Sequence, residues 1–117
     1  MEGPFRLSPQ ATEVDVLAKH FRGFGDPTRL RILDLLRKEE RSVGELVAAL
    51  RQPQPKVSNH LACLRWCGFV AAERRGKRVF YRLSDERVAE VVDTARALLA
   101  DTQSGPVARD STPAGIA

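Results

Sequence analysis

The chain has 117 residues, and its 19 Lys and Arg against 15 Asp and Glu give a net charge of +4. This length fits one small domain, and because its core is modest a subunit interface would add stability. The 43% hydrophobic content excludes wholesale disorder, and no apolar run approaches the roughly 18 residues of a membrane helix. The N-terminus lacks the basic and apolar regions of a signal peptide, so we expect a cytoplasmic protein without membrane contact.

Two amphipathic helices are predicted first. Ser8 and Pro9 favour the start of a helix, since serine caps helices and proline fits the first turn. Asp26 and Pro27 give the same signal for a second helix, which ends at the charged residues 37–41. The first helix has an apolar stripe at helical spacing, formed by Val14, Leu17, Phe21 and Phe24.

A helix-turn-helix pattern occupies the middle of the chain. Ser42 and Glu45 form a capping box at the start of a short helix. A turn with two prolines leads to a second helix from about Pro55 to Trp66, with Gly68 as its C-terminal stop. Two short helices joined in this way are typical of DNA-binding motifs.

A β-hairpin and a last helix follow. Residues 69–73 and 78–83 are rich in β-formers, and the basic residues 74–77 between them predict a turn, so the hairpin would form a wing. Ser84 or Asp85 is expected to cap the last helix.

Composition divides the chain into three parts. We expect a flexible N-terminal arm at 1–8 and a winged helix-turn-helix domain for DNA binding and dimerisation at 9–101. Residues 102–117 are rich in Gly, Pro, Ser, Thr and Ala and predict a disordered tail. The predicted fold class is mainly α with a β-hairpin wing (α+β), dimeric through the first and last helices.

The positive charge is concentrated in one segment. Eight basic residues and one acid lie between Arg51 and Arg82, a net +7 that leaves −3 for the rest of the chain. A local basic block indicates a surface for a polyanion, and double-stranded DNA fits a helix-turn-helix with a basic wing. The alternatives are a solvated charged face or a winged helix that serves only as a protein-interaction scaffold.

Side chains that read base edges lie early in the second helix of the motif, which would enter the major groove. The wing would contact the phosphate backbone or the minor groove. The candidate DNA contacts are Arg51, Gln54, Lys56, Ser58, Asn59, His60, Arg65, Arg74, Arg75, Lys77 and Arg78. For His60, helix packing and metal ligation stay open beside phosphate contact.

The first and last helices have apolar faces that would hold a homodimer. Two-fold symmetry would place two recognition helices about 34 Å apart, as a palindromic operator requires. The candidate interface residues are Val14, Leu17, Phe21, Val88, Val91, Val92, Ala95 and Leu98. Packing within one subunit is the alternative.

Cys63 and Cys67 are the two cysteines of the chain. Four apart on one helix, they share a face, with Cβ atoms roughly 6 Å apart. Two thiolates select soft metal ions over Mg or Ca, whereas the alternative is structural, because cysteine packs as a small hydrophobe. No nucleophile with a base, carboxylate pair or phosphate-binding glycine loop can be assembled, so we predict no enzyme.

The chain resembles the ArsR/SmtB family of winged-helix repressors, which are small dimeric bacterial sensors of metals and other stress signals. The matching stretches are Gly25–Leu33, Val57–Arg65, Gly68–Val70 and Gly76–Leu83. The resemblance covers about residues 15–100. It implies a repressor that leaves its operator when an inducer binds.

The position of the cysteines is similar to that in the CmtR-like branch, which senses cadmium and lead. The arsenic-type cysteines before the turn are absent, because Ser42, Val43 and Gly44 stand there, and the zinc-type site on the last helix lacks both histidines. The stretch Asn59–Gly68 matches the CmtR-like pattern around two cysteines on the recognition helix. The resemblance therefore implies a soft inducer at the cysteine pair, of the Cd, Pb, Hg or arsenite type.

One ligand of that branch is missing here. CmtR-like proteins take a third thiolate from the C-terminal region, and residues 102–117 contain no cysteine. A two-coordinate site suits Hg(II), an oxygen or nitrogen ligand could complete the set, or the site could be vestigial. The alternative function is a repressor of the same family that responds to a non-metal or thiol-redox signal, with a structural cysteine pair.

Overall fold

The structure is a computed structural model that describes residues 9–104. It divides into two units, residues 1–86 and residues 87–117, and each is described by itself. The predicted arm at 1–8 lies outside the described residues. So does the predicted tail from residue 105 onward.

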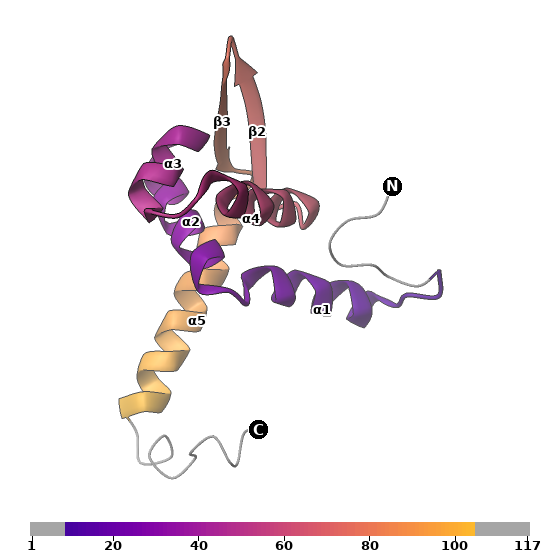
Figure 1. The fold of residues 1–117 in the computed structure, drawn as a ribbon. Helices are drawn as coiled ribbons and strands as arrows, with labels where there is room; N and C mark the ends of the chain where they lie inside the picture. The colour runs from indigo at the N-terminus through magenta and orange to yellow at the C-terminus, as the bar shows by residue number, and fades with distance from the viewer. Residues whose placement is uncertain (1–8, 105–117) are drawn as a thin grey trace. The chain divides into compact units, whose positions relative to one another are not determined.

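The first unit is mainly helical with a small sheet (Figure 1). Its β-hairpin projects beyond the helices, as the wing of a winged helix-turn-helix does (Figure 1). In chain order its elements are α1 (Glu13–Phe24), α2 (Pro27–Lys38), β1 (Arg41–Ser42), α3 (Val43–Leu50), α4 (Gln54–Trp66), β2 (Val70–Arg75) and β3 (Arg78–Leu83). The predicted mainly α fold with a β-hairpin wing is therefore confirmed.

The sheet is antiparallel and has the strand order β1-β3-β2. The hairpin register pairs Arg75 with Arg78, so its turn is only Gly76 and Lys77, shorter than predicted. Gly76 has a φ of 63°, a left-handed conformation that glycine adopts at low cost. Strand β1 was not predicted, because two residues carry no periodic signal and pair with a distant strand.

Side-chain caps fix where the helices begin. Helix α1 begins after Thr12, whose hydroxyl and main chain form a reciprocal capping box with Asp15, so the predicted start at Ser8 and Pro9 is wrong. The Ser42 and Glu45 box at the start of α3 is confirmed, as is Asp26 as the N-cap of α2.

The core lies between the three helices of the DNA-binding motif. Its most buried side chains are Ile32 of α2, Leu46 of α3, and Val57, Leu61 and Leu64 of α4, all at most 1% exposed. Each such side chain contributes about 1.5–3 kcal/mol when it is fully buried. This packing holds one face of α4 inside and turns the other to solvent.

The second unit contains most of α5 (Glu86–Ser104). The helix continues three residues into the segment predicted as tail, and Thr102 donates a hydrogen bond to the Leu98 carbonyl. Val88 and Val92 are buried in the single chain. Val91, Leu98 and Ala95 are exposed. Among residues 9–104 no helix is long and apolar enough to cross a membrane.

Candidate nucleic-acid interface and cysteine site

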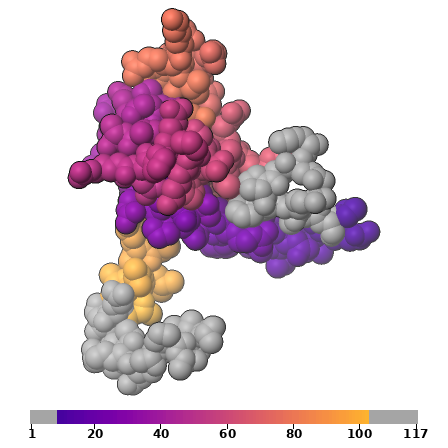
Figure 2. All heavy atoms as spheres, in the orientation of Figure 1, coloured from indigo at the N-terminus to yellow at the C-terminus, as the bar shows by residue number. Residues whose placement is uncertain are grey.

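The solvent face of α4 is polar. Val57, Leu61 and Leu64 occupy its buried side, and the remaining positions turn outward. The exposed predicted contacts on this helix are Gln54, Lys56, Ser58, Asn59 and Arg65. In the space-filling view the atoms of α3 and α4 form an exposed surface below the wing (Figure 2). An exposed row of amide, hydroxyl and ammonium groups beside a hairpin suits the edges of bases and the phosphates next to them.

Arg51 ends α3 in an unusual conformation. Its φ is 57°, and its amide donates to the Val47 carbonyl, which closes the helix before the turn to α4. The side chain is exposed, as a phosphate contact requires.

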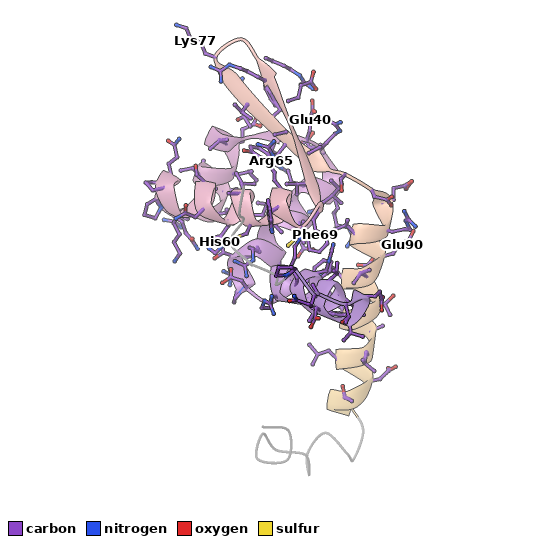
Figure 3. The ribbon with its side chains drawn as sticks, turned by 90° about the vertical axis from the view of Figure 1, so that its right-hand side faces the viewer. Glu40, His60, Arg65, Phe69, Lys77 and Glu90 are labelled. Carbon is purple, nitrogen blue, oxygen red and sulfur yellow. The ribbon has the colours of Figure 1, made fainter. Side chains whose placement is uncertain are left out.

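His60 contacts two residues at the start of α2. Its Nδ1 lies 3.2 Å from the Arg29 guanidinium, and its Nε2 lies 3.7 Å from an Asp26 carboxylate oxygen. The imidazole is 14% exposed, and Figure 3 shows it on α4 beside the preceding helices. Of the three roles left open, helix packing is the one that these contacts favour.

Arg29 joins three helices at this point. Its Nε donates to the Gly23 carbonyl at 2.9 Å and its second terminal nitrogen donates to the Arg22 carbonyl at 3.0 Å. These carbonyls end α1, and a guanidinium there satisfies acceptors that the helix leaves open. Sequence patterns missed this role, because one arginine on α2 carries no signal for the end of another helix.

The surroundings of His60 favour its neutral form, chiefly through burial. Burial lowers its pKa, and the nearby Arg29 and Lys56 lower it further, whereas Asp26 opposes them. Burial by itself would raise the pKa of Asp26, but the Arg29 amide and the His60 and Arg29 charges bring it below its usual value. Since a guanidinium can only donate, Nδ1 accepts and Nε2 carries the hydrogen that faces Asp26.

The four basic residues of the wing tip differ in their surroundings. The Arg75 guanidinium donates hydrogen bonds to Glu40 and Glu73, and the Arg78 guanidinium donates one to the Ser42 hydroxyl at 3.1 Å. Arg74 and Lys77 are exposed, and neither has a hydrogen bond or ion pair within residues 9–104. Lys77 points away from the protein at the tip of the hairpin (Figure 3).

An open groove of about 530 Å³ lies between the wing and the helix-turn-helix. Lys77 and Arg78 line one side, Gly44 and Ala48 of α3 line the other, and Gln54 lies at the start of α4. The groove therefore runs from the start of α4, at Gln54, to the basic wing.

The cysteines lie at the C-terminal end of α4 with unequal exposure. Cys63 is partly exposed, whereas Cys67 is 4% exposed, and both thiols are free. A Cβ built on Gly23 would stand 2.7 Å from the Cys67 sulfur and 3.0 Å from the Phe69 ring, so this thiol packs against α1. Burial raises the pKa of Cys67, partly opposed by the positive charge of Lys19.

The donors at this site fit a soft ion that needs few ligands. Cys63 and Cys67 are one helical turn apart, a spacing at which two sulfurs can serve one soft ion. Within residues 9–104 no three side chains of His, Cys, Asp or Glu come close enough together to hold a metal ion. The described chain thus provides two thiolates and no third ligand beside them.

Helix α1 has one packed face and one apolar solvent face. Phe24 stacks on Phe69 with ring centres 4.2 Å apart, so it belongs to the core of the subunit. The other three residues of the predicted stripe, Val14, Leu17 and Phe21, are between 47% and 67% exposed. Large apolar side chains grouped in this way mark a surface for another protein.

Comparison with known proteins places the chain in a family. Residues 26–72 match the family described as "Bacterial regulatory protein, arsR family". Over 90 residues the chain is 46% identical to the "Probable mercury resistance operon repressor" of Streptomyces lividans, an alignment that covers 77% of this chain and 72% of that protein. The chain belongs to the ArsR family.

Other ArsR-family proteins support the same assignment. The transcriptional regulator CmtR of Mycobacterium tuberculosis is 37% identical over 102 residues, which cover 86% of each chain. The homodimeric winged helix-turn-helix DNA-binding domain of a Mycobacterium bovis protein, solved by NMR, superposes with a TM-score of 0.71 at 28% identity, covering 81% of this chain and 92% of that one. These ArsR-family relatives are regulators, which confirms the prediction that the protein is not an enzyme.

Proposed function

We propose that the protein represses transcription by binding a palindromic operator as a homodimer and is released when a soft thiophilic ion binds Cys63 and Cys67. Operator binding is carried by one observation: Gln54, at the start of the exposed polar face of α4, lines the same groove as Lys77 of the wing. DNA binding places the protein in the cytoplasm.

Helix α4 is the element that reads sequence. Asn59 offers the paired donor and acceptor that suit adenine, and Gln54, at the start of the helix, offers the same groups. Lys56 and Arg65 supply charge for phosphates on either side. Ser58 is short enough to meet a base edge or a phosphate from the same face.

Dimerisation gives the operator its symmetry. The exposed face of α1, formed by Val14, Leu17 and Phe21, and the exposed Val91 and Leu98 of α5 are the surfaces that a second copy would cover. A solved relative is homodimeric. Two recognition helices related by a two-fold axis match half-sites one helical turn apart.

DNA recognition is tested by selecting a duplex from a random pool with the purified protein. We expect an enriched palindrome, and we expect Asn59→Ala to weaken binding to it by about 1–3 kcal/mol while binding to unrelated DNA changes little. Arg31→Ala, at an exposed cation of α2, is the matched control and should retain wild-type affinity. A pool without enrichment, together with no salt-dependent binding, would reject the DNA-binding proposal.

The inducer proposed is a two-coordinate thiophilic ion of the mercuric type. It fits because the described residues offer two thiolates and no third ligand. The relative from Streptomyces lividans, named for mercury resistance, points in the same direction. When bound, such an ion supplies a crosslink between two sulfurs on one face of α4.

The residues around Cys67 explain how occupancy would alter DNA binding. The Cys67 thiol packs beside Gly23 and Phe69, so an ion shared with Cys63 would draw it away from this contact. That movement loosens the end of α1 against the end of α4. Because α1 also carries a proposed dimer surface, the two recognition helices would lose their spacing.

The inducer is tested by adding Hg(II), and separately Cd(II), to the complex with the selected duplex. We expect Hg(II) to release DNA and to produce thiolate absorbance, and we expect Cys63→Ser with Cys67→Ala to abolish both. Ala62→Ser, at an exposed position between them, is the control and keeps both responses. Unimpaired release of the double variant would reject the cysteine site. Release by oxidant alone, with a Cys63–Cys67 bond found by mass spectrometry, would favour the thiol-redox alternative.

A further inference from the structure

The four basic residues at the wing tip divide between the two faces of the hairpin. Side chains alternate along a strand, and directly paired residues share a face. In the observed register Glu73 pairs with Phe80 and Arg75 pairs with Arg78, so these four side chains lie on one face. Arg74, which pairs with Val79, lies on the other face.

The face with Arg75 is tied to the body of the protein. Arg75 donates two hydrogen bonds to the carboxylate of Glu40, at 2.6 and 3.0 Å, and a third to Glu73 at 2.8 Å. Glu40 belongs to the connection between α2 and β1, which lies beside the hairpin (Figure 3). The bond from Arg75 to Glu40 therefore joins the wing to the α2 end of the fold.

A second arginine and one ring complete the same arrangement. Arg78 donates to the Ser42 hydroxyl at the N-cap of α3. The Phe80 ring lies close to both guanidinium groups, with its centre 4.7 Å from the Cζ of Arg75 and 5.0 Å from that of Arg78. A guanidinium over an aromatic face is attracted to it, so the ring helps to hold both cations toward the fold.

The charges at Arg75 leave nothing for a phosphate to neutralise. Two carboxylates surround the Arg75 guanidinium, and the Arg82 guanidinium lies 4.0 Å from Glu73, so these two acids and two arginines together carry no net charge. A phosphate near Arg75 would also meet these two acids. Arg74 and Lys77 have no such partner among residues 9–104, so their charge is available.

We propose that Arg75 is a positioning residue that anchors the wing through Glu40, and that the wing cations contacting DNA phosphate are Arg74 and Lys77. This proposal rests on the proposed DNA binding for its second half. It reverses the simplest interpretation of the basic run at 74–78, in which every cation serves the nucleic acid.

The salt dependence of DNA binding separates a phosphate contact from an anchor. Each phosphate contact adds about one to the slope of log affinity against log salt concentration. We expect Lys77→Gln and Arg74→Gln each to lower the slope by about one per subunit. We expect Arg75→Gln to weaken binding by a similar factor at every salt concentration, with the wild-type slope retained. A fall in slope for Arg75→Gln equal to that for Lys77→Gln would overturn the proposal.

Amide hydrogen exchange tests the anchor without DNA. Glu40→Gln and Arg75→Gln should both speed exchange in the wing, because each removes one end of the same contact, and the double variant should add little. Arg74→Gln is the matched control and should leave exchange in the rest of the hairpin unchanged. Unaltered exchange in Glu40→Gln and Arg75→Gln would reject the anchoring role. If the wild-type chain binds no DNA, the proposed function fails, and this measurement still decides whether Arg75 anchors the wing.

Discussion

Gly23 determines how closely α1 approaches the cysteine end of α4. The position has no side chain, and the space that a Cβ would take is filled by the Cys67 sulfur and the Phe69 ring. The residue is buried inside α1, where glycine weakens a helix by roughly 0.5–1 kcal/mol relative to alanine. Its presence in a helix is therefore explained by contact with Cys67.

Substitution of Gly23 by alanine is expected to destabilise the protein. The added methyl group would stand 2.7 Å from the Cys67 sulfur, and overpacking of this kind costs about 1–3 kcal/mol, more than the gain in helix propensity. Urea unfolding measures the change. Combining Gly23→Ala with Cys67→Ala should recover most of the loss, since the second change removes the sulfur.

A second glycine in a helix provides the control for this effect. Gly44 lies in α3, where a Cβ would meet only the Ser42 hydroxyl oxygen, at 3.9 Å. Gly44→Ala should therefore leave stability unchanged or raise it by up to about 1 kcal/mol. A loss at Gly44 as large as that at Gly23 would contradict the packing explanation.

His60 is expected to make stability depend on pH near neutrality. Its pKa is lower in the folded chain, chiefly because of burial, so the unfolded chain binds more protons below about pH 6.5. The free energy of unfolding should therefore fall as the pH is lowered from about 7 through this range. Urea unfolding at several pH values should show a weaker decline for His60→Gln, and the wild-type decline for Asn59→Gln at its exposed neighbour.

The residues whose roles the sequence left open or assigned differently are those whose contacts come from distant parts of the chain. His60 had three open roles because its partners lie over thirty residues earlier: Asp26 at the N-cap of α2 and Arg29 in its first turn. Arg75 was predicted as a DNA contact like its basic neighbours. The strand register of the structure places it on the same face as Glu73, and it donates a hydrogen bond to Glu40. The sequence pattern could place these residues on a helix or a strand, but it could not identify the side chains that they contact.

At the scale of elements, local hydrogen-bond signals were the most reliable guide. The Ser42 and Glu45 box followed the usual pattern of hydroxyl and glutamate and was predicted correctly. The Thr12 and Asp15 box uses an aspartate in place of glutamate or glutamine, and Ser8 with Pro9 offered a stronger but false signal. Strand β1 depends on pairing with β3 and had no local signal.

The two capping hydroxyls are expected to differ in importance. Ser42 is buried, caps α3 and also accepts from Arg78, so Ser42→Ala removes two interactions. Loss of a cap costs about 0.5–2 kcal/mol, and we expect the upper part of that range here. Thermal unfolding of Thr12→Ala, at an exposed cap of α1, is the comparison and should show the smaller loss. Equal losses would contradict a second role for the Ser42 hydroxyl.

At the scale of the whole molecule, the apolar face of α1 is the proposed surface for dimerisation. The helical spacing of Val14, Leu17 and Phe21 predicted an uncovered stripe, and the structure leaves all three exposed. Val88 and Val92 of α5 were predicted in the same way and are buried in the single chain, because an apolar helical position can face either its own chain or another. Sequence periodicity gives the face of a helix but not the partner that covers it.

Phe21→Glu is expected to convert the proposed dimer to monomers. Phe21 is 58% exposed in the single chain, so the substitution should cost little within the subunit, whereas a dimer would bury two carboxylates on an apolar surface. Sedimentation equilibrium measures the association, and binding to the selected operator should fall by about two orders of magnitude as two linked recognition helices become separate. Ala49→Glu introduces the same charge at an exposed position of α3 near Arg31 and Lys38, and it should remain dimeric. A dimeric Phe21→Glu variant with wild-type operator affinity would place the subunit interface away from this face of α1.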